Sequence, residues 1–159
     1  MQIAQGIERG VYYCDADRKG GTKNSNLMAQ RRFEEVHEKV RIGLEGTKAI
    51  PMVALHMIEC WLLGDKKAIE KTFGVMIEDW KMPNTPEFLW GDDMNPMSNY
   101  PKNYLKRLIR ESDKRYEEFQ GNRADFCSIA EASDISTMLE SCPVSYGRFY
   151  DEFTDMVSV

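Results

Sequence analysis

Two apolar stretches near the start of the chain flank a segment of helical periodicity, and this order restricts the fold. Residues 11–14, VYYC, are β-branched and aromatic, and residues 48–55, KAIPMVAL, are nearly all apolar. Both patterns are typical of buried strands. Apolar residues recur at helical spacing over 27–44. Because a strand, a helix and a strand in series favour a parallel pair joined by a crossover, we expect an α/β fold with a small, mostly parallel sheet. Pro51 favours either an edge position for the second strand or a place at its start.

Residues 56–74 have a helical pattern that Gly64 interrupts. Asp65 follows the glycine and is a preferred residue type for the position that begins a helix, so we expect a second piece over 66–73. The segment 81–100 is rich in Pro, Asn and Gly, which favours a long loop.

Helical patterns resume at Pro101, a residue favoured in the first turn of a helix. The expected helices cover residues 101–119, 123–132, 135–142 and 146–157. We therefore predict one domain over 1–159, in which an α/β part (1–80) and a helical part (101–159) are joined by the loop 81–100.

Composition and charge predict a cytoplasmic protein without a membrane partner. The chain has 159 residues and a net charge of −5. It has no apolar run near the roughly 20 residues that span a bilayer, and MQIAQGIERG does not have the pattern of a secretion signal. The four cysteines form no C-x-x-C pair, so we expect reduced thiols instead of a zinc site. On an acidic chain, contact with nucleic acid requires a local basic patch or a bridging cation.

Asp15 and Asp17 directly follow the first predicted strand. Alternate residues of a strand point to the same side, and ligands of open α/β sheets bind at the carboxyl ends of the strands. Two carboxylates there repel each other unless a cation offsets their charge, and Mg²⁺ prefers such oxygen ligands. The alternative is that both aspartates only stabilise a turn.

Several motifs in series resemble a known family. DADRKG is similar to the D-x-D-x-x-G motif of Toprim domains, and further similar stretches follow in order: ALHMIECWLLGD, PEFLW, YPKNYLKRLI and CPVSYGRFYDEF. Together they resemble a Toprim-like family of unknown function, related to the Toprim domains of OLD-type nucleases, over residues 11–153. The resemblance implies a nuclease or phosphodiester hydrolase that uses Mg²⁺ or Mn²⁺. It also implies a place beside ABC-type ATPases in prokaryotic defence loci.

The chain departs from the Toprim pattern before Asp15. Toprim domains carry a glutamate on a first strand well upstream of the D-x-D, whereas Glu8 is too close to Asp15 to belong to such a strand. We therefore expect the first strand and its glutamate to be missing, which leaves the catalytic set inferred from the family incomplete.

Glu59 matches an E-x-W position of the family and is a candidate metal ligand or base. The alternative is a glutamate favoured in the first turn of a helix by the helix dipole. His56 lies three residues earlier and would share a face with Glu59 if the helix had begun. We interpret His56 as an ordinary surface residue and Trp61 as core.

A basic stripe begins at the predicted start of the helix at Pro101. Lys102, Lys106 and Arg110 recur at a spacing of four residues, and Lys102 is our candidate for phosphate binding. Arg18, beside the aspartates, is the second candidate. The alternative is that Lys102, Lys106 and Arg110 only form a solvated helix face, and that Arg18 only offsets the charge of the aspartates.

Two functions remain open from the sequence. The first is a metal-dependent phosphodiester hydrolase in which Asp15 and Asp17 hold Mg²⁺, Glu59 assists, and nucleic acid is the substrate. The second is a non-catalytic scaffold that binds a partner ABC-type ATPase or another copy of itself.

Overall fold

The structure, a computed structural model, describes residues 9–16 and 26–158. In these ranges the sheet consists of two parallel strands, β1 (Gly10–Asp15) and β2 (Ala49–Ala54). Their register places Tyr12 opposite Pro51 and Asp15 opposite Ala54. The predicted α/β class and the parallel pair are confirmed. β1 pairs with only one side of β2, so the other side is an edge, where a proline is tolerated.

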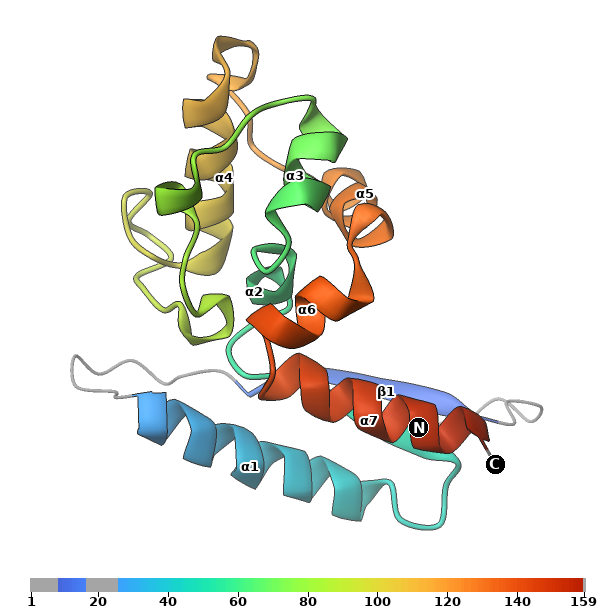
Figure 1. The fold of residues 1–159 in the computed structure, drawn as a ribbon. Helices are drawn as coiled ribbons and strands as arrows, with labels where there is room; N and C mark the ends of the chain where they lie inside the picture. The colour runs from blue at the N-terminus through green and yellow to red at the C-terminus, as the bar shows by residue number, and fades with distance from the viewer. Residues whose placement is uncertain (1–8, 17–25, 159) are drawn as a thin grey trace.

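Two helices, α1 (Asn26–Gly43) and α7 (Ser145–Ser158), pack against this sheet (Figure 1). Alternate residues of β2 pack against the two helices, because successive side chains of a strand point to opposite faces. Val53 belongs to a buried cluster with Phe33 of α1, and Ala54 to a cluster that includes Phe149 of α7. The last helix of the chain therefore returns to the sheet.

β1 is less buried than its composition predicts. Val11, Tyr12 and Tyr13 are each exposed over more than two fifths of their surface. The prediction of a buried, interior strand is wrong, because β1 is an edge strand in the described part of the chain.

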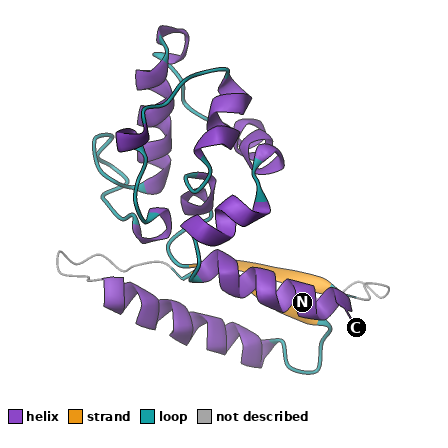
Figure 2. Ribbon diagram, viewed as in Figure 1, coloured by secondary structure: helices purple, strands orange, loops and turns teal. Residues whose placement is uncertain are grey.

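The other helices form a body on one side of the sheet layer (Figures 1 and 2). They are α2 (Glu59–Leu62), α3 (Lys66–Phe73), α4 (Pro101–Ser112), α5 (Arg123–Ala132) and α6 (Ile135–Ser141). Their core contains Leu63, Ile69, Leu105, Ile109 and Ile129, each at most 1% exposed. None of the helices in the described ranges has both the length and the apolar character needed to cross a bilayer.

The helix after β2 is divided as predicted. α2 ends before Gly64, and the Asp65 side chain accepts a hydrogen bond from the Ala68 amide at 3.0 Å at the start of α3. The helix nevertheless begins at Glu59 and not at His56. Gly74 ends α3 in the left-handed conformation that favours glycine (φ 61°).

α4 is shorter than predicted. It ends at Ser112, and Asp113 adopts an extended conformation and accepts a hydrogen bond from the Arg115 amide at 2.8 Å. A short 3₁₀ turn, η3 (Lys114–Tyr116), follows. An aspartate that bonds to the backbone two residues later competes with continued helix, which explains why the helical pattern of 101–119 is interrupted.

The predicted loop is irregular apart from the 3₁₀ turns η1 (Asp79–Lys81) and η2 (Pro86–Phe88). Arg107 of α4 holds part of it, donating to the Pro96 and Ser98 carbonyls at 3.1 and 3.0 Å. The loop is therefore tied to the helical body by side-chain bonds to its backbone.

Candidate functional site

The carboxyl ends of the two strands bring Asp15 and Glu59 to the same edge of the sheet. Asp15 is the last residue of β1, and the Ala16 amide extends the pairing by donating to the Ala54 carbonyl at 2.8 Å. The chain then continues from β2 into α2, whose first residue is Glu59. This edge is where open α/β sheets bind ligands.

Tyr13 bonds to Asp15 and lines the same pocket as Glu59. It lies on the same side of β1 as Asp15, and its hydroxyl donates a hydrogen bond to the Asp15 carboxylate. Partial burial raises the pKa of Tyr13 far above its usual value, and the bond to Asp15 and the negative charges of Asp15 and Glu59 raise it further. The phenol therefore stays neutral and remains a hydrogen-bond donor to the Asp15 carboxylate.

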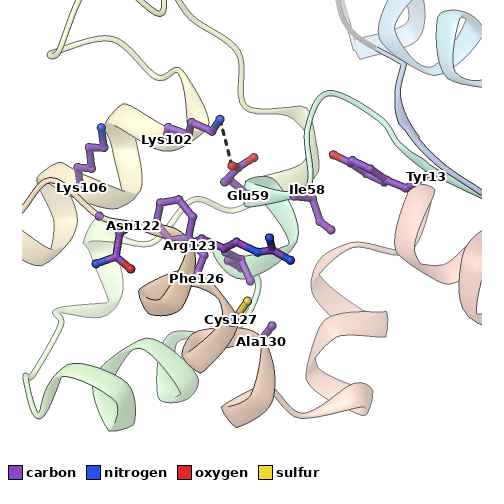
Figure 3. Close-up of a pocket in the computed structure, with 12 residues that line it drawn as sticks. Tyr13, Ile58, Glu59, Lys102, Lys106, Asn122, Arg123, Phe126, Cys127 and Ala130 are labelled. Carbon is purple, nitrogen blue, oxygen red and sulfur yellow. Dashed lines mark ion pairs between the residues drawn. The ribbon is translucent and has the colours of Figure 1, made fainter.

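Glu59 is paired with Lys102 of α4. The Lys102 Nζ lies 3.3 Å from the Glu59 Oε1, and the Glu59 side chain is only 10% exposed. Figure 3 shows this ion pair at the wall of a pocket. A nearly buried carboxylate requires a charged partner. In this structure Lys102 is that partner, so its ammonium group is bound to Glu59.

The pocket has a volume of about 680 Å³ and lies between Tyr13, α2, α4 and α5. Its cationic residues are Lys102 and Lys106 of α4 and Arg123 of α5, and its apolar wall includes Phe126 (Figure 3). A volume of this size is typical of small-molecule sites. Tyr13 and Glu59 belong to its lining. The pocket therefore opens beside the acidic edge, by which we mean the carboxyl end of the sheet that carries Asp15 and Glu59.

The basic stripe of α4 divides between two roles. Lys102 and Lys106 line the pocket, whereas the Arg110 Nε donates to the Phe119 carbonyl at 2.6 Å. Arg110 therefore holds the turn after α4 and does not line the pocket.

His56 is not the surface residue that the sequence analysis predicted. It is 3% exposed and its ring meets the Tyr100 ring edge-on, with centroids 6.0 Å apart. Because α2 begins at Glu59, His56 and Glu59 do not share a helix face. Trp61 is 4% exposed, which confirms the prediction of a core residue.

Two predicted site residues, Asp17 and Arg18, lie outside the described residues. Among the described residues, no group of three or more His, Cys, Asp and Glu side chains could hold a metal ion. Mg²⁺ is nevertheless often held by one or two carboxylates with water completing its shell. The exposed Asp15 carboxylate at the sheet edge suits such a cation, with Asp17 as the proposed second ligand.

Sequence reasoning did not find Tyr13, Arg123 or Phe126 as site residues. Tyr13 had the pattern of a core strand, and Arg123 and Phe126 belong to an amphipathic helix far along the chain. One local signal was present: Asn122 is a preferred residue type before a helix and forms a reciprocal capping box with Asp125. This capping box marks where α5 begins, but it does not reveal that α4 lies across the pocket from α5.

Comparison with protein-family models, with curated proteins and with solved structures finds no match to this chain.

Proposed function

We propose that the chain is a Toprim-like, divalent-metal-dependent phosphodiester hydrolase, a nuclease or nuclease subunit of a prokaryotic defence system that acts in the cytoplasm. The observation that supports it most is the grouping of Asp15, Tyr13 and Glu59 at the carboxyl edge of a parallel sheet. A pocket with three cationic side chains opens beside this group. Acidic residues for a cation next to basic residues for phosphate are what phosphodiester hydrolysis requires.

In this proposal Asp15 and Asp17 hold Mg²⁺ or Mn²⁺, which when bound supplies a Lewis acid that polarises a phosphoryl oxygen. Tyr13 orients the Asp15 carboxylate through its hydroxyl. Arg18 and Lys102 bind the phosphate.

The ion pair between Glu59 and Lys102 gives the two residues linked roles. Lys102 is 44% exposed, so an entering phosphate can reach its ammonium group. The phosphate competes with Glu59 for the lysine, and the released carboxylate is then able to accept a proton from the attacking water. Glu59 thus acts as the base, and Lys102, which holds Glu59 before the substrate enters, neutralises the substrate once the phosphate has taken the place of the carboxylate.

A cleavage assay tests the proposal. Labelled single-stranded and double-stranded DNA and RNA are incubated with the chain in MgCl₂, MnCl₂ or EDTA, alone and with a co-expressed ATPase. We expect cleavage only with a divalent cation, loss of cleavage in Asp15→Asn and Asp17→Asn, and a loss of about 100-fold in Glu59→Gln. Asp155→Asn, an exposed change on α7, is the matched control. Cleavage that Asp15→Asn and Asp17→Asn leave intact contradicts the proposal.

The exposed edge strand β1 favours a second candidate function, a non-catalytic scaffold. Val11, Tyr12 and Tyr13 are more exposed than is usual for apolar strand residues, and exposed strand edges pair readily with other chains. In this alternative the chain binds a partner ABC-type ATPase or a second copy of itself. The scaffold is supported if the chain cleaves no nucleic acid but associates stably with the ATPase or with itself, and if Val11→Lys abolishes this association.

A further inference from the structure

We infer that the pocket between Tyr13, α2, α4 and α5 binds a nucleotide unit, a phosphate together with its base, held by Arg123 and Phe126, with Lys106 for a neighbouring phosphate. The inference deepens the proposed function, on which it rests for the choice of substrate class. The unit comes either from a free nucleotide or from the end of a single strand, and the two sources share this chemistry.

The charges of the pocket favour an anion. Lys106 and Arg123 form no ion pair with another residue in the described ranges, whereas Lys102 is paired with Glu59. Two uncompensated cations facing one pocket are notable on a chain with a net charge of −5. Figure 3 shows their charged ends apart, on the α4 and α5 sides of the pocket, so each would bind phosphate oxygens separately, as ammonium and guanidinium groups do strongly.

The rest of the lining favours a flat apolar group attached to that anion. Leu62, Ile58 and Ala130 contribute apolar surface next to the ring of Phe126. The backbone of Gly121 lies directly against this ring: a side chain at 121 would place its first carbon 3.0 Å from the tip of Phe126. Gly121 also has a φ of 67°, which favours glycine. The ring is therefore held in place, as a surface for base stacking should be.

The pocket also meets the acidic edge. Tyr13 and Glu59 line it, and Figure 3 shows Arg123 extending from α5 across the pocket toward Ile58. A nucleotide with its base on Phe126 and its phosphate near Arg123 would leave Lys106 and Lys102, both on α4, for neighbouring phosphates. The scissile bond would then lie toward Glu59 and Asp15.

Binding is measured in EDTA, so that the result does not depend on metal or on cleavage. The probes are adenosine monophosphate, a fluorescein-labelled thymidine hexanucleotide and inorganic phosphate. We expect Lys106→Ala to weaken binding of the hexanucleotide, and Arg123→Ala to weaken binding of both nucleotide probes, each about tenfold, as loss of a charged hydrogen bond does. Phe126→Leu, which keeps an apolar side chain but removes the ring, should weaken it about fivefold. Lys67→Ala and Arg31→Ala, exposed and outside the pocket, are the matched controls and should bind normally.

Cys127 gives a second readout, because it lines the pocket and is exposed. Its alkylation by iodoacetamide should slow when adenosine monophosphate or the hexanucleotide is bound. Protection by the mononucleotide identifies a free nucleotide as the ligand, and protection by the hexanucleotide alone identifies a strand end. Both results support the inference.

Absence of binding and of protection with either nucleotide probe overturns the inference, as does inorganic phosphate binding as tightly as the nucleotides. The proposed function fails separately. Binding in EDTA without any metal-dependent cleavage contradicts hydrolysis alone, and metal-dependent cleavage without nucleotide binding in the pocket contradicts this inference alone.

Discussion

Glu87 accepts a hydrogen bond from the Ser145 hydroxyl at 2.8 Å, and both residues are 1% exposed. The same carboxylate accepts from the Val144 and Ser145 amides at 2.8 Å each, and the Trp61 indole donates to the Ser145 hydroxyl at 2.9 Å. One buried carboxylate thus joins the long loop to the start of α7. It fixes α7 on the sheet and, through Trp61, fixes α2, which carries Glu59.

Replacing Glu87 should destabilise the chain strongly. Glu87→Gln replaces one of the two carboxylate oxygens by an NH₂ group, which cannot accept a hydrogen bond. At least one of the buried donors, the Val144 and Ser145 amides and the Ser145 hydroxyl, then loses its acceptor. We expect a loss of about 2–4 kcal/mol in the free energy of unfolding, measured by urea titration. Glu118→Gln, an exposed change, is the control. A loss of less than about 0.5 kcal/mol would show that the network contributes little.

The ion pair between Glu59 and Lys102 should show measurable coupling in a double-mutant cycle. Lys102→Ala leaves the nearly buried Glu59 without its partner, and Glu59→Gln removes the charge that needs one. Because Lys102 is 44% exposed, solvent screens the pair, and we expect a coupling of about 0.5–1.5 kcal/mol from urea unfolding. Additive effects of the two changes would contradict direct pairing. Lys106 has no carboxylate partner in the described residues, so Lys106→Ala should not couple to Glu59→Gln.

Stability should fall at alkaline pH because of the buried thiols. Burial raises the pKa of Cys60 to about 12, and burial also raises the pKa of Cys142. An unfolded thiol ionises near pH 8.5, so between that pH and about 12 the unfolded state binds fewer protons than the folded state. The stabilisation is complete below about pH 8.5 and is lost as pH rises through this window.

Urea unfolding from pH 7 to 11 measures this slope, which should be smaller in Cys60→Ala. Cys127→Ala, which removes an exposed thiol instead of a buried one, is the matched control. Equal slopes in the parent chain and Cys60→Ala would contradict the role of the buried thiol.

What the sequence predicts correctly is local in origin. Asp65 was identifiable as a cap because it directly precedes a helical pattern, and its first carboxylate oxygen performs that role. Its second oxygen accepts from the Asp134 amide at 2.8 Å, a contact 69 residues away that no local pattern signals. The burial of His56 was missed for the same reason, because the Tyr100 ring that covers it belongs to the far end of the loop.

The candidate site divides in the same way. Asp15, Glu59 and Lys102 were recognisable from residue type and position, but their order in the chain does not reveal that Lys102 pairs with Glu59. Tyr13 was misjudged because an aromatic residue in a strand pattern predicts core, whereas its hydroxyl serves the neighbouring aspartate. The pocket requires α5 to lie opposite α4, which depends on the packing of the whole helical body.

The most direct test of the account is thermal unfolding with and without a divalent cation. If Asp15 and Asp17 hold the ion, millimolar MgCl₂ or MnCl₂ should raise the unfolding temperature by about 3–6 °C, the effect of a ligand near ten times its dissociation constant. The rise should vanish with EDTA and in Asp15→Asn, and persist in Asp155→Asn. An unfolding temperature that does not respond to either cation, or that responds equally in Asp15→Asn, would contradict a metal site at this edge of the sheet.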